Sequence, residues 1–428
     1  MMCYTSPMNI KLGFGAGFQE ADVPEENIIQ ILEQNDTASD EPASVPDILR
    51  RALENPIGSQ RLRDIVKPGE KIAIITSDIT RPIPTWEVIP SVLEELSAAN
   101  VSDDDVTLVF ALGSHRAHTE EERRRLAGDA YGRIHCVDSD PSDCIPLGTT
   151  SRGTPVDITR VVAEADRIVL LGNIEYHYFA GYSGGIKALF PGASTPEAIQ
   201  ANHSMMVEDT ACAGNLDSNP LRDDLEEASR ICPVDFILNV VLDEHKHIAH
   251  AVAGDVVKAH REGCKILDKL YRVKIPERAD IVIVSQGGAP KDLNLYQTQK
   301  ALDNSKHAVK DGGTIILVGS CREGLGQKTF EEWITQVKAP ADLTKRVRED
   351  FKLGGHKAAA IAMVLERANI KLVSEMNPDL VSQIFLEPYA DLQHAVDDAL
   401  EEQRAHLDEQ AEPKIIIMPY GGSTLPSL

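Results

Sequence analysis

The segment 172–203 holds most of the side chains in this chain that are suited to catalysis. It contains His177 between two tyrosines, the glycine pair Gly184–Gly185, Lys187 and His203, and it has no other basic side chain. A lone ammonium group in an apolar, glycine-lined setting has a lowered pKa, which makes its amine nucleophilic. Lys187 is therefore predicted to be reactive. The alternative is a tight turn with a surface lysine and two core histidines.

A second polar motif, SDITRP, follows the apolar run 71–76 and contains Asp78 and Arg81. An arginine can hold a carboxylate or a phosphate through two parallel hydrogen bonds. Arg81 is therefore a candidate for binding an anionic substrate, with a structural Asp–Arg pair at a turn as the alternative.

Two histidines share the motif GSHRAHT, which follows the apolar run 106–112. Thr119, with Glu122 three residues later, predicts a capping box at the start of a helix, and His118 is then placed at that cap. His115 is the better acid–base candidate, because histidine titrates near neutral pH. Together with His177 from another loop, it would suit a racemase or epimerase that needs one group on each face of its substrate.

Gln297 and Lys300 open a predicted helix over 297–310, where the helix dipole favours a bound carboxylate. The alternative is a solvated helix start. His203 by itself is a poor metal site unless a cofactor supplies further ligands. The glycine pairs Gly184–Gly185 and Gly287–Gly288 are candidates for presenting backbone amides to a phosphate, but neither matches a GxGxxG or Walker pattern.

Short apolar runs alternate with amphipathic runs along the chain. This pattern predicts an α/β fold, Rossmann-like, with mainly parallel sheets. We expect strands over 71–76, 106–112, 167–172, 236–242, 280–285, 313–319 and 414–418, and helices over 86–98, 119–126, 256–270, 297–310 and 356–368.

The predicted organisation has two domains, 1–272 and 273–412, with a final strand and tail at 413–428. Return of this strand to the first domain is one of the arrangements that the sequence leaves open. Ligands of open parallel sheets bind beyond the carboxyl ends of the strands. The polar loops follow those ends, so we expect an active site in the cleft between the domains.

Composition argues against several classes of protein, among them nucleic-acid-binding, membrane-spanning and secreted proteins. The 428 residues carry a formal net charge of −24, which disfavours nucleic-acid binding. We expect no membrane span, because no run approaches eighteen apolar residues, and no signal peptide, because the first residues lack a basic and an apolar region. The 7 cysteines form no CxxC pair, which fits a reducing cytoplasm.

Four of these motifs together resemble the nickel-pincer lactate racemase family. They are SDITRP, GSHRAHT, the block GNIEYHYFAGYSGGIKALFPG with its later Asn–His pair, and YQTQKA. The resemblance extends from about Lys11 to the terminal PYGGSTLP, and the central block is its most specific part. It implies an isomerase that acts on 2-hydroxy acids.

The resemblance also implies a cofactor, a nickel-pincer nucleotide (pyridinium-3-thioamide-5-thiocarboxylic acid mononucleotide). Lys187 matches the lysine that tethers this group, His203 the nickel ligand, and Asp78, Gly184 and Gly185 positions on the cofactor side. His115 and His177 match the acid–base pair. The matches for substrate binding are Arg81, Gln297 and Lys300.

In the mechanism implied, one histidine takes the hydroxyl proton while hydride leaves the α-carbon. The planar 2-keto acid then reorients and takes hydride back on its other face. Such an enzyme depends on the proteins that make the cofactor. The sequence leaves the oligomeric state open.

One part of the sequence departs from the lactate-specific pattern, which has a tryptophan late in the chain. Here the tryptophans are Trp86 and Trp333, and the expected region reads LGGHKAAAIAMVLER. His356 or Lys357 would occupy that part of the pocket, or would be solvated at a helix start. A 2-hydroxy acid larger or more polar than lactate is therefore an open alternative. So are a metal-free Schiff-base enzyme built on Lys187 and a non-catalytic hydroxy-acid-binding protein.

Overall fold

The computed structural model describes residues 7–33, 44–243, 246–408 and 411–428. Two compact units divide the chain, a central unit (37–269) and a terminal unit (residues up to 36 and from 270 onward). The boundary near 270 lies close to the predicted one. The structure otherwise divides the chain differently from the prediction, because the first strands belong with the C-terminal part rather than with the residues that follow them.

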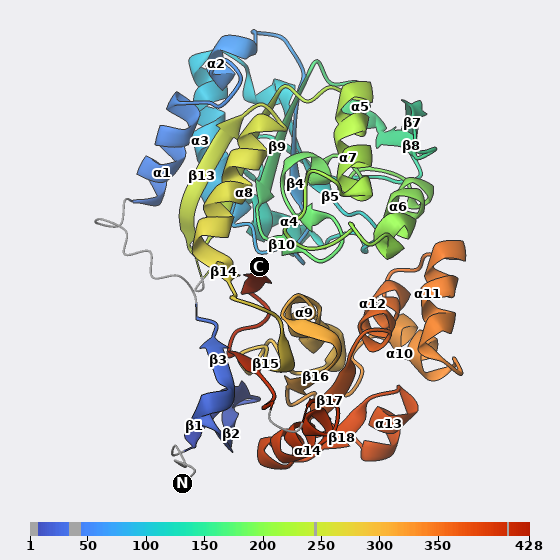
Figure 1. Ribbon diagram of the computed structural model, residues 1–428. Helices are drawn as coiled ribbons and strands as arrows, with labels where there is room; N and C mark the ends of the chain where they lie inside the picture. Colours follow the sequence, from blue (N-terminus) through green and yellow to red (C-terminus); the bar gives the residue numbers. More distant parts are fainter. Residues whose placement is uncertain (1–6, 34–43, 244–245, 409–410) are drawn as a thin grey trace. The chain divides into compact units, whose positions relative to one another are not determined.

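A six-stranded sheet forms the middle of the central unit (Figure 1). Its strands in spatial order are β13 (Ile248–Gly254), β12 (Phe236–Leu242), β9 (Arg167–Asn173), β4 (Ile72–Ser77), β5 (Val106–Ala111) and β6 (His135–Asp138). All neighbours are parallel except β12 and β13. Counted from β4 along the chain, this is the order 3-2-1-4-5-6 of the Rossmann fold, so the predicted fold class is confirmed.

The alternation of side chains along each strand explains why these segments are apolar throughout. Ile72 and Ile74 face a core shared with α1 and α3, whereas Ala73 and Ile75 face a second core shared with α7. A parallel sheet covered on both faces needs apolar residues at every position. The apolar runs could therefore be recognised from the sequence.

Helices and hairpins surround this sheet. The helices of the central unit are α1 (Val45–Glu54), α2 (Leu62–Ile65), α3 (Thr85–Ala98), α4 (Glu120–Ala127), α5 (Arg160–Ala163), α6 (Pro196–His203), α7 (Pro220–Ile231) and α8 (Lys258–Tyr271), which ends at the boundary. The hairpins pair β7 (Cys144–Thr149) with β8 (Pro155–Thr159), and β10 (Tyr176–His177) with β11 (Gly181–Tyr182). The predicted capping box of Thr119 and Glu122 is present at α4.

The terminal unit contains a second, all-parallel sheet. Its order is β18 (Glu387–Tyr389), β17 (Asn369–Val373), β16 (Val309–Val318), β15 (Ala279–Ser285), β19 (Ile415–Met418) and β3 (Ile28–Ile31). The final predicted strand is β19, and it lies between β15 and β3. It therefore completes the terminal unit and does not return to the central one.

Further elements complete the terminal unit. They are the hairpin β1 (Met8–Phe14) with β2 (Gly17–Val23), the parallel pair β14 (Arg272–Lys274) with β20 (Leu425–Ser427), and the helices α9 (Leu295–Ser305), α10 (Lys328–Thr335), α11 (Pro340–Glu349), α12 (Gly355–Leu365), α13 (Pro378–Gln383) and α14 (Leu392–Arg404). Apolar residues of α14 and of the β1–β2 hairpin pack on one face of the sheet. None of the described helices is both long and apolar enough to cross a membrane.

Candidate active site

The candidate residues of the central unit follow the carboxyl ends of three adjacent strands. Asp78 and Arg81 come after β4, His115 after β5, and His177 after β9. The strand order reverses between β4 and β9, and loops at such a reversal form the ligand site of doubly wound sheets. The topology therefore assembles these residues around one edge of the central sheet.

Asp78 and His115 form a hydrogen-bonded pair. Asp78 is 3% exposed, and its Oδ2 accepts a hydrogen bond from His115 Nδ1. Its Oδ1 accepts from the Thr80 hydroxyl at 2.7 Å. Burial raises the pKa of the Asp78 carboxyl, but the hydrogen bonds from His115 and Thr80 outweigh it and hold the pKa below its usual value. An ionised Asp78 keeps the proton of His115 on Nδ1 and leaves Nε2 as the basic nitrogen.

His118 has a structural role, as predicted from its place at the helix cap. Its ring is buried, with Nδ1 2.7 Å from Asp138 Oδ1. Its Nε2 accepts a hydrogen bond from the backbone N–H of Ile79 at 3.1 Å. The two ring nitrogens therefore join the loop after β5 to the end of β6 and to the loop after β4.

His177 lies on β10, in a short hairpin that is held from two sides. Its Nδ1 accepts a hydrogen bond from the Ala180 N–H at 3.3 Å, so the neutral ring carries its proton on Nε2. The hydroxyls of Tyr176 and Tyr182 both donate to Asp268 of α8, at 2.9 and 2.8 Å. Burial, together with the positive charge of nearby Lys187, holds the pKa of His177 well below 6.5.

The glycine pair before Lys187 fits a position where no other residue has room. Gly184 and Gly185 have φ of 74° and 59°. A Cβ on Gly184 would lie 2.8 Å from Asn239 Oδ1, and one on Gly185 would lie 2.8 Å from the ring of His260. The Gly185 N–H donates to Asn239 Oδ1 at 2.7 Å. This amide is therefore used within the protein, in contrast to its predicted availability for a phosphate.

Lys187 follows this turn in a short 3-10 helix, Gly185–Ala188, and is half-buried. Among the described residues its amine has no ion-pair or hydrogen-bond partner, and it lies 5.7 Å from the centre of the Phe179 ring. Burial and the positive charges of Arg222 and Arg81 hold its pKa well below 10.5, against an opposing effect of Glu175. A neutral amine is the form that attacks an electrophile.

Arg222 is a buried cation that the sequence reasoning missed. It is 1% exposed, and its Nη2 donates to the carbonyl oxygens of Ala180, at 3.2 Å, and Tyr182. It therefore holds the chain between His177 and Lys187. Its helix α7 begins with Asn219–Pro220, an asparagine cap followed by proline at the first turn, and this signal alone would have located the helix.

His203 ends α6, and its Nδ1 lies 3.1 Å from Asn202 Oδ1. The ring also packs edge-on against Phe179, with centroids 4.8 Å apart. Because Lys187 contacts the same phenylalanine, the structure brings the predicted tether and the predicted metal ligand to one aromatic ring.

The predicted substrate-binding residues are all exposed. Arg81 forms no side-chain hydrogen bond or ion pair among the described residues, and its charge helps to lower the pKa values of His177 and Lys187. Gln297 and Lys300 lie in the terminal unit on one face of α9, whose start is capped by Asn294. Their joint action with Arg81 in a cleft between the units stays a prediction.

The region that departs from the lactate-specific pattern is a helix start, but it is not solvated. His356 and Lys357 are each 6% exposed, and Lys357 Nζ donates to the Tyr296 carbonyl oxygen at 2.6 Å. Trp333 is buried under Arg346 and against Gly355, so its role is in the core.

Metal-ligating side chains do not form a cluster in the described part of the chain. No group of three or more His, Cys, Asp or Glu side chains is placed to hold an ion there. His203 is a single imidazole donor, and any resident metal would need its other ligands from an organic group.

Comparison with known proteins agrees with this architecture. The family model for the lactate racemase N-terminal domain matches residues 14–214, and that for the lactate racemase C-terminal domain matches residues 275–425. A lactate racemase of Thermoanaerobacterium thermosaccharolyticum is 35% identical over 97% of this chain and 99% of its own length. A lactate racemase of Lactiplantibacillus plantarum is 33% identical over 88% of this chain and 90% of its own.

Solved structures give the same result. The lactate racemase apoprotein of T. thermosaccharolyticum superimposes with a TM-score of 0.86 at 33% identity, over 98% of this chain and all of that chain. A protein of Thermotoga maritima has a TM-score of 0.63 at 17% identity, covering 91% and 99% of the two chains, and shares the fold. The chain therefore belongs to the lactate racemase family and is an isomerase.

Proposed function

We propose that this enzyme racemises a 2-hydroxy acid, lactate or a larger relative, with a nickel-pincer nucleotide tethered to Lys187. The observation that carries the proposal is the pair of histidines after β5 and β9. Neutral His115 presents a lone pair at Nε2, whereas neutral His177 presents an N–H at the same atom. His115 can accept the hydroxyl proton of a substrate at Nε2, and His177 can donate a hydrogen bond to a substrate oxygen from Nε2–H. The two rings therefore offer suitable groups for the two faces that a racemase must serve.

The residues fit the proposed cofactor. Lys187 offers an amine whose pKa is lowered by burial and by Arg222, and His203 offers one imidazole nitrogen. Because the described residues form no metal cluster of their own, the further ligands would belong to the cofactor. When bound, this group supplies an acceptor for the hydride of the substrate α-carbon.

The protein's own part in the reaction concerns binding and protons. Arg81 holds the substrate carboxylate through paired hydrogen bonds, which fixes the position of the reacting carbon. His115, oriented by Asp78, takes the hydroxyl proton at Nε2. After the 2-keto acid has reoriented, its carbonyl oxygen takes a proton on the other side from His177, which acts as an acid when it carries protons on both ring nitrogens. In the reverse direction the two histidines exchange roles. Gln297 and Lys300 are proposed as further contacts to the carboxylate.

The test is to produce the chain together with the proteins that make the cofactor and to measure intact mass, nickel content and the racemisation of chiral 2-hydroxy acids. We expect a mass increase on the peptide that contains Lys187, about one nickel per chain, and exchange of enantiomers. K187A is the matched control and should lack the added mass. Racemisation by unmodified, nickel-free protein, with a substrate adduct on Lys187 that borohydride traps, would favour the Schiff-base alternative. Ligand binding without exchange would favour a binding protein.

A further inference from the structure

His203 is the last member of a chain of buried hydrogen bonds that begins in the β7–β8 hairpin. Thr150 Oγ1 lies 2.5 Å from Asp224 Oδ1. Asp224 Oδ2 accepts from Asn202 Nδ2 at 2.8 Å, and Asn202 Oδ1 lies 3.1 Å from His203 Nδ1. Asn202 and Asp224 are each 0% exposed and Thr150 is 4% exposed. The elements involved, α6, α7 and the hairpin, contact one another (Figure 1).

The chemistry of the groups sets the direction of every bond in this chain. A carboxylate only accepts hydrogen bonds, so Thr150 donates its hydroxyl proton to Asp224 and Asn202 turns its NH₂ group toward the other oxygen. The amide oxygen of Asn202 then faces His203. Because that oxygen accepts, His203 Nδ1 must donate, and the lone pair of the neutral ring lies on Nε2.

Among the described residues, Thr150 and Asn202 are the hydrogen-bond donors to the Asp224 carboxylate. Asp224 has no ion-pair partner among the described residues, and a buried carboxylate without one needs hydrogen bonds to offset its desolvation. The hydroxyl of Thr150 is itself held in place, because it accepts from the Thr154 N–H at 3.1 Å. Both oxygens of Asp224 and the hydroxyl of Thr150 are therefore engaged within the protein.

We propose that Asp224, acting through Asn202, fixes the proton of His203 on Nδ1 and thereby presents Nε2 as the metal-binding nitrogen. Asp224 and Asn202 are positioning residues. A partner on the second ring nitrogen sets which nitrogen of a histidine binds metal and raises its basicity. The role of His203 as a ligand rests on the proposed function, whereas the fixed tautomer does not.

The test uses the full chain labelled with ¹⁵N-histidine, in which long-range ¹⁵N–¹H spectra report the tautomer of each neutral imidazole; H203Q identifies the signal. In wild-type protein without cofactor we expect His203 to carry its proton on Nδ1. In D224N the new amide can face Asn202 with either its NH₂ group or its oxygen. Among the described groups, the weaker hydrogen bond from Asn202 Nδ2 to the Leu221 carbonyl oxygen, at 3.4 Å, then remains to orient Asn202, so the Nε2–H form should appear.

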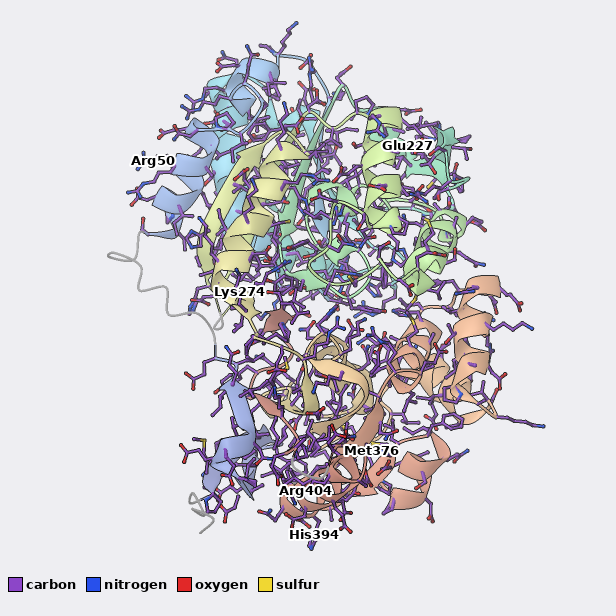
Figure 2. The ribbon with its side chains drawn as sticks, viewed as in Figure 1. Arg50, Glu227, Lys274, Met376, His394 and Arg404 are labelled. Carbon is purple, nitrogen blue, oxygen red and sulfur yellow. The ribbon has the colours of Figure 1, made fainter. Side chains whose placement is uncertain are left out.

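A second readout uses matured protein, in which nickel is measured after dialysis against a chelator. D224N should retain nickel roughly tenfold less well than wild type, while the mass added at Lys187 is unchanged. E227Q is the matched control. Glu227 (labelled in Figure 2) lies on the same helix and accepts from Ser151 N–H at 2.7 Å and from its hydroxyl at 2.6 Å, outside the chain that leads to His203. It should leave tautomer and nickel unchanged.

An Nε2–H tautomer in wild-type protein would overturn the proposal without any variant, and so would an unchanged Nδ1–H tautomer in folded D224N. N202A, which removes the acceptor that faces Nδ1, gives a second variant if D224N does not fold, and the Nε2–H form should appear in it as well. T150V keeps the carboxylate that orients Asn202 and should leave the tautomer unchanged. A shifted tautomer with fully retained nickel would establish the positioning role and contradict the proposed ligand role of His203.

Discussion

Asp78 Oδ2 accepts the Nδ1 proton of His115, and this bond joins the loops that follow two adjacent parallel strands, β4 and β5. The pair was not recognised from the sequence, where Asp78 was expected on the cofactor side. It makes Asp78 an orienting group for the proposed base, because a carboxylate keeps the Nδ1 tautomer and stabilises the imidazolium that forms when Nε2 takes a proton.

Substitution D78N is expected to lower kcat by about 10²- to 10⁴-fold, because an amide can hold His115 in the wrong tautomer. The measurement is the initial rate of racemisation from each enantiomer with cofactor-loaded protein. R116Q is the control, since Arg116 follows His115 but pairs with Glu122 at the surface. A D78N protein with wild-type kcat would show that His115 does not act as the base.

At pH 7, Lys187 should react with reagents that modify only the uncharged form of an amine. Its lowered pKa gives it a larger fraction of free amine than an ordinary lysine, and removing a nearby positive charge should reduce that fraction. We therefore expect R81Q to shift the pH dependence of Lys187 labelling upward in protein without cofactor, as measured by mass spectrometry of peptides. Labelling of the exposed Lys328 serves as the internal reference. An identical profile in R81Q would contradict the electrostatic coupling.

Gly185→Ala should destabilise the central unit more than Gly153→Ala. Both glycines have positive φ, 59° and 87°, but an added Cβ meets the His260 ring at 2.8 Å in one case and nothing within 4 Å in the other. In both variants, holding alanine at a positive φ lowers the free energy of unfolding by about 1–2 kcal/mol. At Gly185 alone, overpacking lowers it further, by about 1–3 kcal/mol. Urea unfolding of both variants measures the difference. Equal losses would mean that His260 can move away.

The stability of the protein should fall in acid partly through His260. This ring is 1% exposed, donates from Nε2 to the Ser183 carbonyl oxygen at 2.8 Å, and has its pKa lowered by burial to about 3. Between pH 6.5 and 3 the unfolded chain binds a proton that the folded one does not. The free energy of unfolding therefore decreases as pH falls, by about 1.4 kcal/mol per pH unit from this group.

The check is urea unfolding of wild type and H260Q from pH 8 to pH 4, where H260Q should show the shallower decline. H394Q is the comparison, because the contribution of His394 to stability should change with pH in the opposite direction. Asp391 raises the pKa of the exposed His394, so the contribution of that residue is present at low pH and lost as pH rises above 6.5. Parallel curves for wild type and H260Q would show that His260 titrates normally.

The strands of both sheets were predictable because burial on both faces makes their sequences apolar throughout. Each strand expected from the sequence is present, and β16 alone begins several residues earlier, at Val309. Periodicity carries no information on which distant strand is a neighbour. The placement of β3 beside β19, 384 or more residues away, therefore escaped prediction.

In the candidate site, too, local sequence patterns were predictive and contacts between distant residues were not. Motifs with local spacing led to Lys187, His115 and His177, because glycine turns and strand ends are visible in the sequence. Arg222, which holds the chain between His177 and Lys187, did not stand out, and neither did Asp224, which accepts from Asn202. Both are ordinary residues of the amphipathic helix α7. Their roles depend on the packing of α7 against residues far away in the chain.

The pairing of β3 with β19 has a consequence for the order in which the protein is made. The central unit has all its strands once residue 254 has been synthesised. By contrast, β3 meets its partner strand only after Ile417 has left the ribosome. An apolar strand that precedes the central unit in the sequence therefore has no partner strand until the whole central unit has been synthesised. During that interval the unpaired strand is a site at which the nascent chain is prone to aggregate.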